Sequence, residues 1–264
     1  MPGLVGVLAV LGMAVVVPLG LRLLATPGAG RLVPIWPAAA LAAGWALLLP
    51  RGPLAVALAV PYALGCAAVA VLALLRLLRE RRLGTAEMAA AFAGASLVIA
   101  ASSLLSERAG AELAGFPLAI HGLTVAHFHF AAFAAVLVAA HTARAAGSRT
   151  ASVAAWAVPA GTALTFVGFF TGEYVELAGA TVLTGGLLAT SVVLLRLRPN
   201  AFLVVAALAL PLTMAFAMWW AAGEAMGFAH PTLRQMAATH GVANALGVGL
   251  CGVLGWRRTG PDPL

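Results

Sequence analysis

Residues 121–141 read HGLTVAHFHFAAFAAVLVAAH, and this stretch decides the fold class. It contains no Asp, Glu, Lys or Arg and is long enough to cross the hydrocarbon core of a bilayer as a helix, which needs about 20 apolar residues. A transmembrane β-strand would instead alternate polar and apolar residues over about ten positions. The stretch therefore predicts a membrane-spanning helix, in which four histidines lie where water is scarce.

Similar apolar runs fill the rest of the chain. Hydrophobic residues make up 63% of its 264 residues and charged residues only 9%, whereas soluble domains carry about 25% charge. The sequence therefore predicts an all-α, polytopic transmembrane helical bundle of about nine spanning helices, forming a single integral membrane domain over residues 1–264. The predicted runs are 3–22, 35–50, 53–75, 86–105, 116–141, 151–171, 175–195, 200–222 and 234–256.

Arginine, which supplies every one of the fifteen Lys and Arg residues, is distributed unevenly between the gaps. One set of alternate gaps holds Arg51, Arg108 and Arg234, together with five of the eight acidic residues. The other set holds the remaining arginines: Arg22, Arg31, Arg76, Arg79, Arg81, Arg82, Arg144, Arg149, Arg196, Arg198, Arg257 and Arg258. Because positive charge in short loops marks the cytoplasmic side, we expect the N-terminus outside and the C-terminus inside.

The same distribution indicates where the protein lies and what surrounds it. The formal charge of +7 does not point to nucleic acid, since the arginines flank apolar runs instead of forming a basic helix or patch. We expect a multi-pass protein of the cytoplasmic (inner) membrane whose partner is the lipid bilayer. Cys66 and Cys251 lie in separate apolar runs, so no disulfide framework is expected.

Several prolines lie inside the apolar runs, among them Pro18, Pro61, Pro159 and Pro211. A proline within a helix has no N–H and leaves a carbonyl of the preceding turn without its helical partner. In membrane helices, hydroxyls and neighbouring helices satisfy such carbonyls. We therefore expect local kinks whose freed carbonyls are bonded from other side chains.

The histidines are the candidate functional residues. At about 100° per residue, His127 and His129 point about 160° apart, so one helix offers ligands to two different clefts. His240 and Asn244, four residues apart, share one face of the last run. We expect a site between the fifth and ninth runs, below the outer surface. The candidate metal ligands are His121, His127 and His240, and the candidate polar pathway or rim comprises Asn244, His230, Glu173 and Glu224.

Two segments resemble heme-ligand helices. Residues 124–130, TVAHFHF, resemble the paired-histidine helix of heme-copper oxidase subunit I, and the Thr-His-Gly at 239–241 is similar to the helix that supplies the other low-spin heme ligand. The resemblance implies that His129 and His240 are axial ligands of a heme b, that His127 serves a second cofactor or a hydrogen bond, and that Arg234 pairs with a propionate. The two segments occur in reversed chain order and the chain has no adjacent histidine pair, so the resemblance does not extend to oxygen reduction.

Across its whole length the chain resembles the YndJ-like family of bacterial membrane proteins. The resemblance lies in the histidine-rich central helix, residues 121–141, and in the C-terminal segment THGVANALG, residues 239–247. It implies the multi-pass architecture and carries no settled activity.

Three functional hypotheses follow. The leading one is a heme or transition-metal site for electron transfer or sensing, with the redox or membrane protein partner left open. The second is a transporter or channel that uses the same His and Asn side chains as a substrate or proton path. The third is a structural membrane partner without a cofactor, in which the histidines link helices. Whether the protein is an enzyme is left open, and no Ser-His-Asp set or phosphate loop points to hydrolase chemistry.

Overall fold

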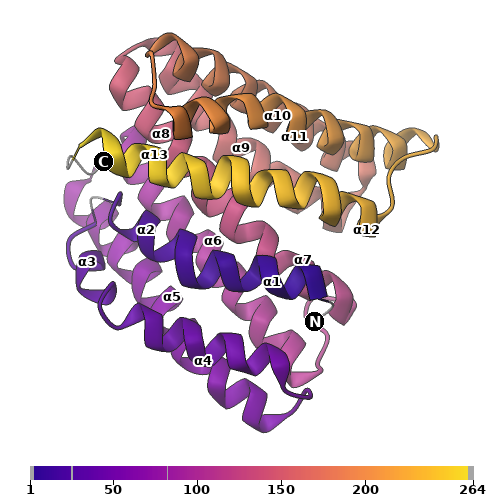
Figure 1. The fold of residues 1–264 in the computed structure, drawn as a ribbon. Coiled ribbons are helices and arrows are strands. Elements are labelled where there is room, and N and C mark those ends of the chain that lie inside the picture. The colour runs from indigo at the N-terminus through magenta and orange to yellow at the C-terminus, as the bar shows by residue number, and fades with distance from the viewer. Residues whose placement is uncertain (1–2, 25, 82, 261–264) are drawn as a thin grey trace. The chain divides into compact units, whose positions relative to one another are not determined.

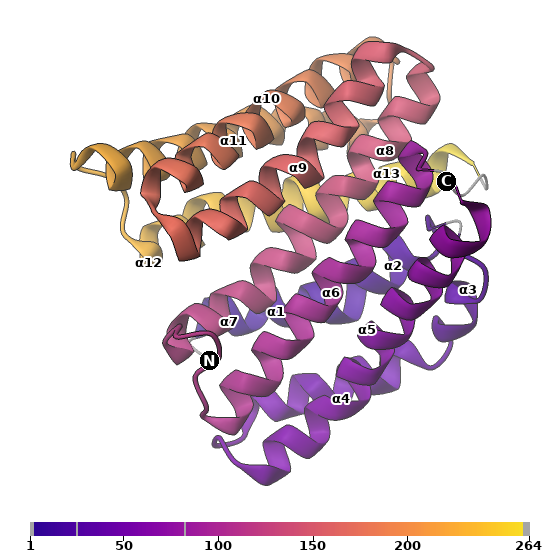
Figure 2. The same cartoon turned by 180° about the vertical axis from the view of Figure 1, so that it is seen from behind.

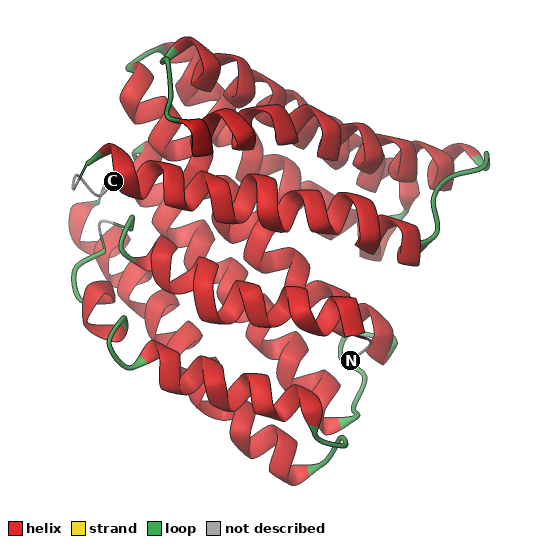
Figure 3. Ribbon diagram, viewed as in Figure 1, coloured by secondary structure: helices red, strands yellow, loops and turns green. Residues whose placement is uncertain are grey.

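The computed structural model describes residues 3–24, 26–81 and 83–260, which form two compact units. The first unit ends at Ala134 and the second begins at Ala135, so the boundary falls inside one continuous helix. Figure 3 shows helices joined by short loops throughout the described residues, and one isolated β-bridge joins Leu113 and Phe116. The predicted all-α fold class is confirmed.

Eight helices of the described chain are long and apolar enough to cross a membrane. The second predicted run forms a shorter helix, α4 (Trp36–Leu48), whose 13 residues span about 20 Å against the roughly 30 Å of a hydrocarbon core. Where the sequence predicted nine spans, the described residues contain eight candidate spans and one short apolar helix. The spans are Gly3–Leu21, Pro53–Glu80, Thr85–Ala109, Leu118–Ala146, Arg149–Thr171, Glu173–Arg196, Ala201–Met226 and Leu233–Thr259.

Antiparallel helices build the first unit. Figure 1 shows α4 running back alongside the first span. Figure 2 shows the helices α5 and α6 side by side. The elements other than α4 are α1 (Gly3–Leu11), the π-helical turn η1 (Gly12–Val16), α2 (Val17–Leu21), α3 (Ala29–Leu32), α5 (Pro53–Glu80), α6 (Thr85–Ala109), α7 (Leu118–His127) and the π-helical segment η2 (Phe128–Ala134).

Charged residues gather at both ends of α5 and α6. At one end, Arg76 of α5 donates from Nη2 to Oε1 of Glu87 on α6, at 2.9 Å. At the other end, Arg51 lies against Glu107. Arg82, one of the arginines used to predict orientation, lies outside the described residues. The side of the membrane to which each end belongs stays a prediction.

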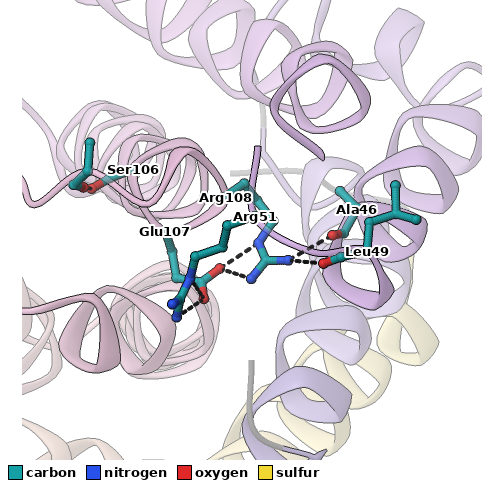
Figure 4. A network of polar contacts seen from close by, with 7 residues as sticks. Ala46, Leu49, Arg51, Ser106, Glu107 and Arg108 are labelled. Atoms are coloured by element: carbon teal, nitrogen blue, oxygen red, sulfur yellow. Dashed lines mark hydrogen bonds and ion pairs between the residues drawn. The ribbon is translucent and has the colours of Figure 1, made fainter. Parts of the chain in front are cut away.

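A buried ion network lies at the end where Arg51 meets Glu107 (Figure 4). Glu107 and Arg108 are 1% and 2% exposed, and the Glu107 carboxylate lies between the guanidinium groups of Arg51 and Arg108. Arg108 also donates from Nη1 to the carbonyls of Ala46 and Leu49, at 2.9 and 3.0 Å. These carbonyls end α4 and have no helical donors, so Arg108 caps the short helix.

The second unit consists of the remaining helices, and α10 contacts both α9 and α11. Its elements are α8 (Ala135–Ala146), α9 (Arg149–Thr171), α10 (Glu173–Arg196), α11 (Ala201–Met226), α12 (Leu233–Met236), the π-helical segments η3 (Ala237–Gly241) and η4 (Asn244–Cys251), and α13 (Gly252–Thr259). Asn200 joins two of them, accepting from the Leu203 amide at the start of α11 and donating to the Gly255 carbonyl of α13.

Glycines bring α9 and α10 into direct backbone contact. A Cβ added at Gly161 would lie 2.3 Å from the backbone nitrogen of Leu183, and one added at Gly179 would lie 2.2 Å from that of Thr165. Gly168 is equally close to backbone of α10. Because real Cβ atoms do not approach backbone so closely, only glycine fits these positions, as is common where membrane helices pack closely.

Two of the intrahelical prolines have their freed carbonyls bonded from other elements, as the sequence predicts. Pro211 leaves the Ala207 carbonyl of α11 without an amide, and the Ser191 hydroxyl of α10 donates to it at 2.6 Å. Pro18 follows the π-helical turn η1, in which hydrogen bonds run from residue i to i−5, and so leaves the Met13 carbonyl free. The Trp36 indole N–H donates to that carbonyl at 2.9 Å.

Candidate functional site

His129 is the most deeply buried histidine of the described chain, with 0% of its surface exposed. It lies in η2, and its Nε2 is 2.6 Å from the hydroxyl of Tyr62 on α5. Tyr62 is also 0% exposed, and the two rings meet edge to face with centroids 5.9 Å apart. Two polar side chains from helices 67 positions apart in sequence thus pair inside the first unit.

Aromatic and small residues enclose this pair. Trp36 meets the Tyr62 ring edge to face at 5.3 Å, and the buried Cys66 follows Tyr62 by one turn of α5. Gly12 of η1 faces His129, because a Cβ added there would lie 2.7 Å from the His129 Cβ. We call Gly12, Trp36, Tyr62, Cys66 and His129 the Tyr62–His129 centre.

The second ring nitrogen of His129 has no hydrogen-bond partner among the described residues. This Nδ1 is buried, and Gly12 covers it, with an added Cβ only 2.8 Å away. The Val125 carbonyl, one turn earlier on the same helix, interacts with the ring but does not meet the geometry of a hydrogen bond to Nδ1. Burying an unpaired polar nitrogen costs about 1–3 kcal/mol, so the fold tolerates a cost at this position.

Two π-helical segments meet at the centre. Gly12 belongs to η1 and His129 to η2, and these two segments are in contact. A π-helical turn inserts one extra residue into a helix and loosens the regular ladder of backbone bonds, and such turns occur frequently at functional sites. The centre therefore combines an unpaired imidazole nitrogen with two irregular stretches of backbone.

The other histidines of the first unit lie apart from this centre. His127 is exposed and meets the Phe128 ring, which confirms that His127 and His129 point to opposite sides of their helix. His121 is buried, and its Nε2 accepts from the Leu113 amide at 3.1 Å. This hydrogen bond joins the loop before α7 to the first turn of that helix.

His240, in the second unit, has both ring nitrogens engaged. Nδ1 donates to the Thr213 carbonyl of α11 at 2.9 Å, and Nε2 is 2.9 Å from the amide nitrogen of Asn244. The shared face predicted for His240 and Asn244 is confirmed by this contact. Together the two bonds hold the ring between α11 and the last span.

These contacts give no evidence of a heme or metal site. Within the described residues, no group of three or more His, Cys, Asp or Glu side chains is arranged to hold a metal ion. A heme iron needs a free imidazole nitrogen, whereas Nε2 of His129 faces Tyr62 and Nε2 of His240 faces Asn244. His129 belongs to the first unit and His240 to the second, so their convergence stays a prediction.

Three of the four residues predicted as a polar pathway or rim, His230, Glu173 and Glu224, lie at one end of the second unit's helices, and Asn244 lies beside His240 within the last span. His230, between α11 and α12, places Nε2 3.1 Å from Oε1 of Glu224. Glu173 begins α10 and is exposed, and Arg234 on α12 is also exposed. Glu176, one turn beyond Glu173, lies within electrostatic range of both Glu173 and Glu224.

Sequence reasoning did not find Tyr62, Trp36 or Gly12. One signal was available for Tyr62, because the chain contains only two tyrosines and this one lies in the middle of an apolar run. A buried tyrosine hydroxyl needs a partner, so its position alone points to a polar neighbour. Nothing in the local sequence indicates that this neighbour is His129.

The apolar spans and the buried polar pairs between them define a multi-pass integral membrane protein. The sequence matches the YndJ-like protein family over residues 7–248, and the chain belongs to that family. Comparison with curated proteins and with solved structures gave no match. The local resemblance to heme-copper oxidase subunit I is not supported.

Proposed function

We propose that the protein is a membrane transport protein in which the Tyr62–His129 centre passes a proton. The observation that carries the proposal is the unpaired Nδ1 on a fully buried imidazole whose Nε2 is held by a tyrosine hydroxyl. Ionisable side chains inside a membrane are costly and commonly mark ion or proton pathways. Imidazole is suited to this task because it accepts a proton on one nitrogen and releases one from the other.

The geometry supplies the two sides of such a step. When the Tyr62 hydroxyl donates to Nε2, Nδ1 carries the proton of the ring, and when Nε2–H donates to the hydroxyl, Nδ1 is the acceptor. One proton crosses the ring when Nδ1 releases its proton, Nε2 takes the hydroxyl proton of Tyr62, and the incoming transported proton restores the hydroxyl. The contact of η1 with η2 places irregular backbone beside the ring, as in transporters whose sites lie at interrupted helices.

Proton flux into liposomes containing the purified protein tests this proposal. A pH-sensitive dye reports the flux under an imposed membrane potential. Tyr62→Phe keeps the ring and removes the hydroxyl, so we expect the flux to fall at least about tenfold. Tyr174→Phe is the matched control, because Tyr174 is 72% exposed and is the chain's other tyrosine. Flux in the parent no greater than in empty liposomes, or full flux in Tyr62→Phe, contradicts the proposal.

A heme or metal site is the second candidate, and the unpaired Nδ1 of His129 is the observation that favours it. It ranks below proton transfer because the Nε2 atoms of His129 and His240 already have partners. The absorbance spectrum and metal content of the purified protein separate the two. A Soret band or stoichiometric metal that disappears in His129→Ala supports ligation, and a colourless, metal-free protein leaves proton transfer.

A further inference from the structure

We propose that residues 227–232, which join α11 to α12, form a proton-responsive latch. The segment is docked on α11 when the His230 ring carries two protons and is released when it loses one. This inference concerns the second unit and does not depend on the Tyr62–His129 centre.

Three contacts dock the segment on α11. The Trp219 indole N–H donates to the Ala229 carbonyl at 2.9 Å, and His230 Nε2 lies 3.1 Å from Oε1 of Glu224. The His230 ring also meets Trp220 edge to face, with centroids 4.9 Å apart. Of these three contacts, the one with Glu224 pairs the imidazole with an opposite charge, so this contact carries most of the response.

Gly223 makes room for the docked ring. A Cβ added at this position would lie 2.4 Å from the His230 Cβ and 2.7 Å from its ring carbons. Because Gly223 lies on α11 next to Glu224, its missing side chain allows the imidazole to settle against the helix. The absence of a side chain at Gly223 therefore lets the segment dock on α11 at this position.

Both nitrogens of the His230 ring face oxygen acceptors. Nε2 faces the Glu224 carboxylate, and Nδ1 lies 3.2 Å from the Pro231 carbonyl. An imidazolium donates to both oxygens, whereas a neutral imidazole has one N–H and donates to only one. Docking is therefore stronger when the ring is an imidazolium facing the ionised Glu224 carboxylate, and weaker when the ring is neutral.

The surrounding carboxylates act in the same direction, whereas the positive charge of Arg234 opposes them. Glu224 is the carboxylate in contact with the ring, and Glu176 of α10 lies within electrostatic range of both Glu224 and Glu173. Arg234, on α12, is exposed four residues after His230. A protonated ring is attracted to this acidic end of α10 and α11, and a neutral ring is not. The side chains of His230 and Glu224 are 25% and 35% exposed, so solvent protons reach them.

A spin label on the segment tests the latch in the full-length protein. Phe228 is 46% exposed, so a label on Phe228→Cys in a Cys251→Ser background reports the mobility of the segment. Cys66 is fully buried and is left in place. We expect the ratio of mobile to docked label to rise about fivefold between pH ~5.5 and pH ~8, because a charge-assisted hydrogen bond is lost.

Four variants decide the outcome. His230→Gln and Glu224→Gln each remove one partner and should abolish the pH response. Gly223→Ala should leave the segment mobile at both pH values, because its Cβ excludes the His230 ring. Glu173→Gln changes a nearby charge without touching the contact and should keep the response. A parent protein whose label is equally mobile at both pH values overturns the proposal, as does a response that survives in both His230→Gln and Glu224→Gln.

Discussion

Ser191→Ala tests whether a hydroxyl on α10 compensates for Pro211 on α11. The substitution removes the donor to the Ala207 carbonyl, and Pro211 supplies no amide to replace it. Ser191 is 5% exposed and Ala207 0%, so water does not reach the carbonyl. An unsatisfied buried carbonyl costs about 1–3 kcal/mol, and interhelical bonds measured in membrane proteins average about 0.6 kcal/mol with a maximum near 1.7. We therefore expect a loss of about 1–2 kcal/mol in the free energy of unfolding.

The second half of the experiment is the same substitution in a Pro211→Ala background. The new amide at position 211 restores the helical bond to the Ala207 carbonyl, so Ser191→Ala should then cost less than about 0.5 kcal/mol. Reversible unfolding in mixed detergent micelles gives the four free energies of the cycle. Thr190→Ala is the control, because the Thr190 hydroxyl donates within its own helix, to Gly186. Equal losses for Ser191→Ala in both backgrounds would show that the hydroxyl does not compensate for the proline.

Three further substitutions test other features of the fold by the same unfolding measurement. Trp36→Phe removes the indole donor to the Met13 carbonyl and should destabilise the protein by about 1–3 kcal/mol, and an unchanged stability would argue against that bond. Gly179→Ala should cost about 2 kcal/mol or more, because its Cβ would clash with the backbone of α9. Gly185→Ala is the control: the position has open space around it, so the substitution should be neutral or stabilising by up to about 1 kcal/mol. Equal effects of the two substitutions would contradict the close helix contact. Arg108→Gln should cost about 3–5 kcal/mol, because it leaves a buried carboxylate with one cation fewer and removes the donor to two carbonyls at the C-terminal end of α4. A loss below about 1 kcal/mol would refute that role.

Much of the fold follows from the sequence, because hydrocarbon imposes simple demands. Each run of about 20 apolar residues without charge has to be a helix, since the bilayer offers no partner to free backbone groups. The one difference lies at the second run, where Pro37 and Pro50 leave only the 13 residues of α4 in helix. Helical geometry also predicted the opposite directions of His127 and His129, since angular separation within one helix depends only on spacing.

The candidate site was less predictable, because it depends on which helices meet. Tyr62 and His129 are 67 residues apart, and no periodic pattern specifies their pairing. The π-helical turns are equally hidden, since an extra residue in a helical turn is accommodated by packing and leaves no compositional mark. The ligand roles of His121 and His240 were predicted from residue type alone and stay predictions. The structure adds hydrogen-bond partners of both residues that the sequence did not indicate.

The glycine contacts between α9 and α10 limit how the second unit moves. Gly161 lies opposite Leu183, Gly168 opposite Glu176 and Gly179 opposite Thr165, and in every pair the two residue numbers add to the same value. Sliding either helix by one residue would bring a side chain onto main chain at each of these points. We therefore expect α9 and α10 to move together as one body in any rearrangement of the second unit. Distances between probes on their outward faces should stay constant while other helices change position.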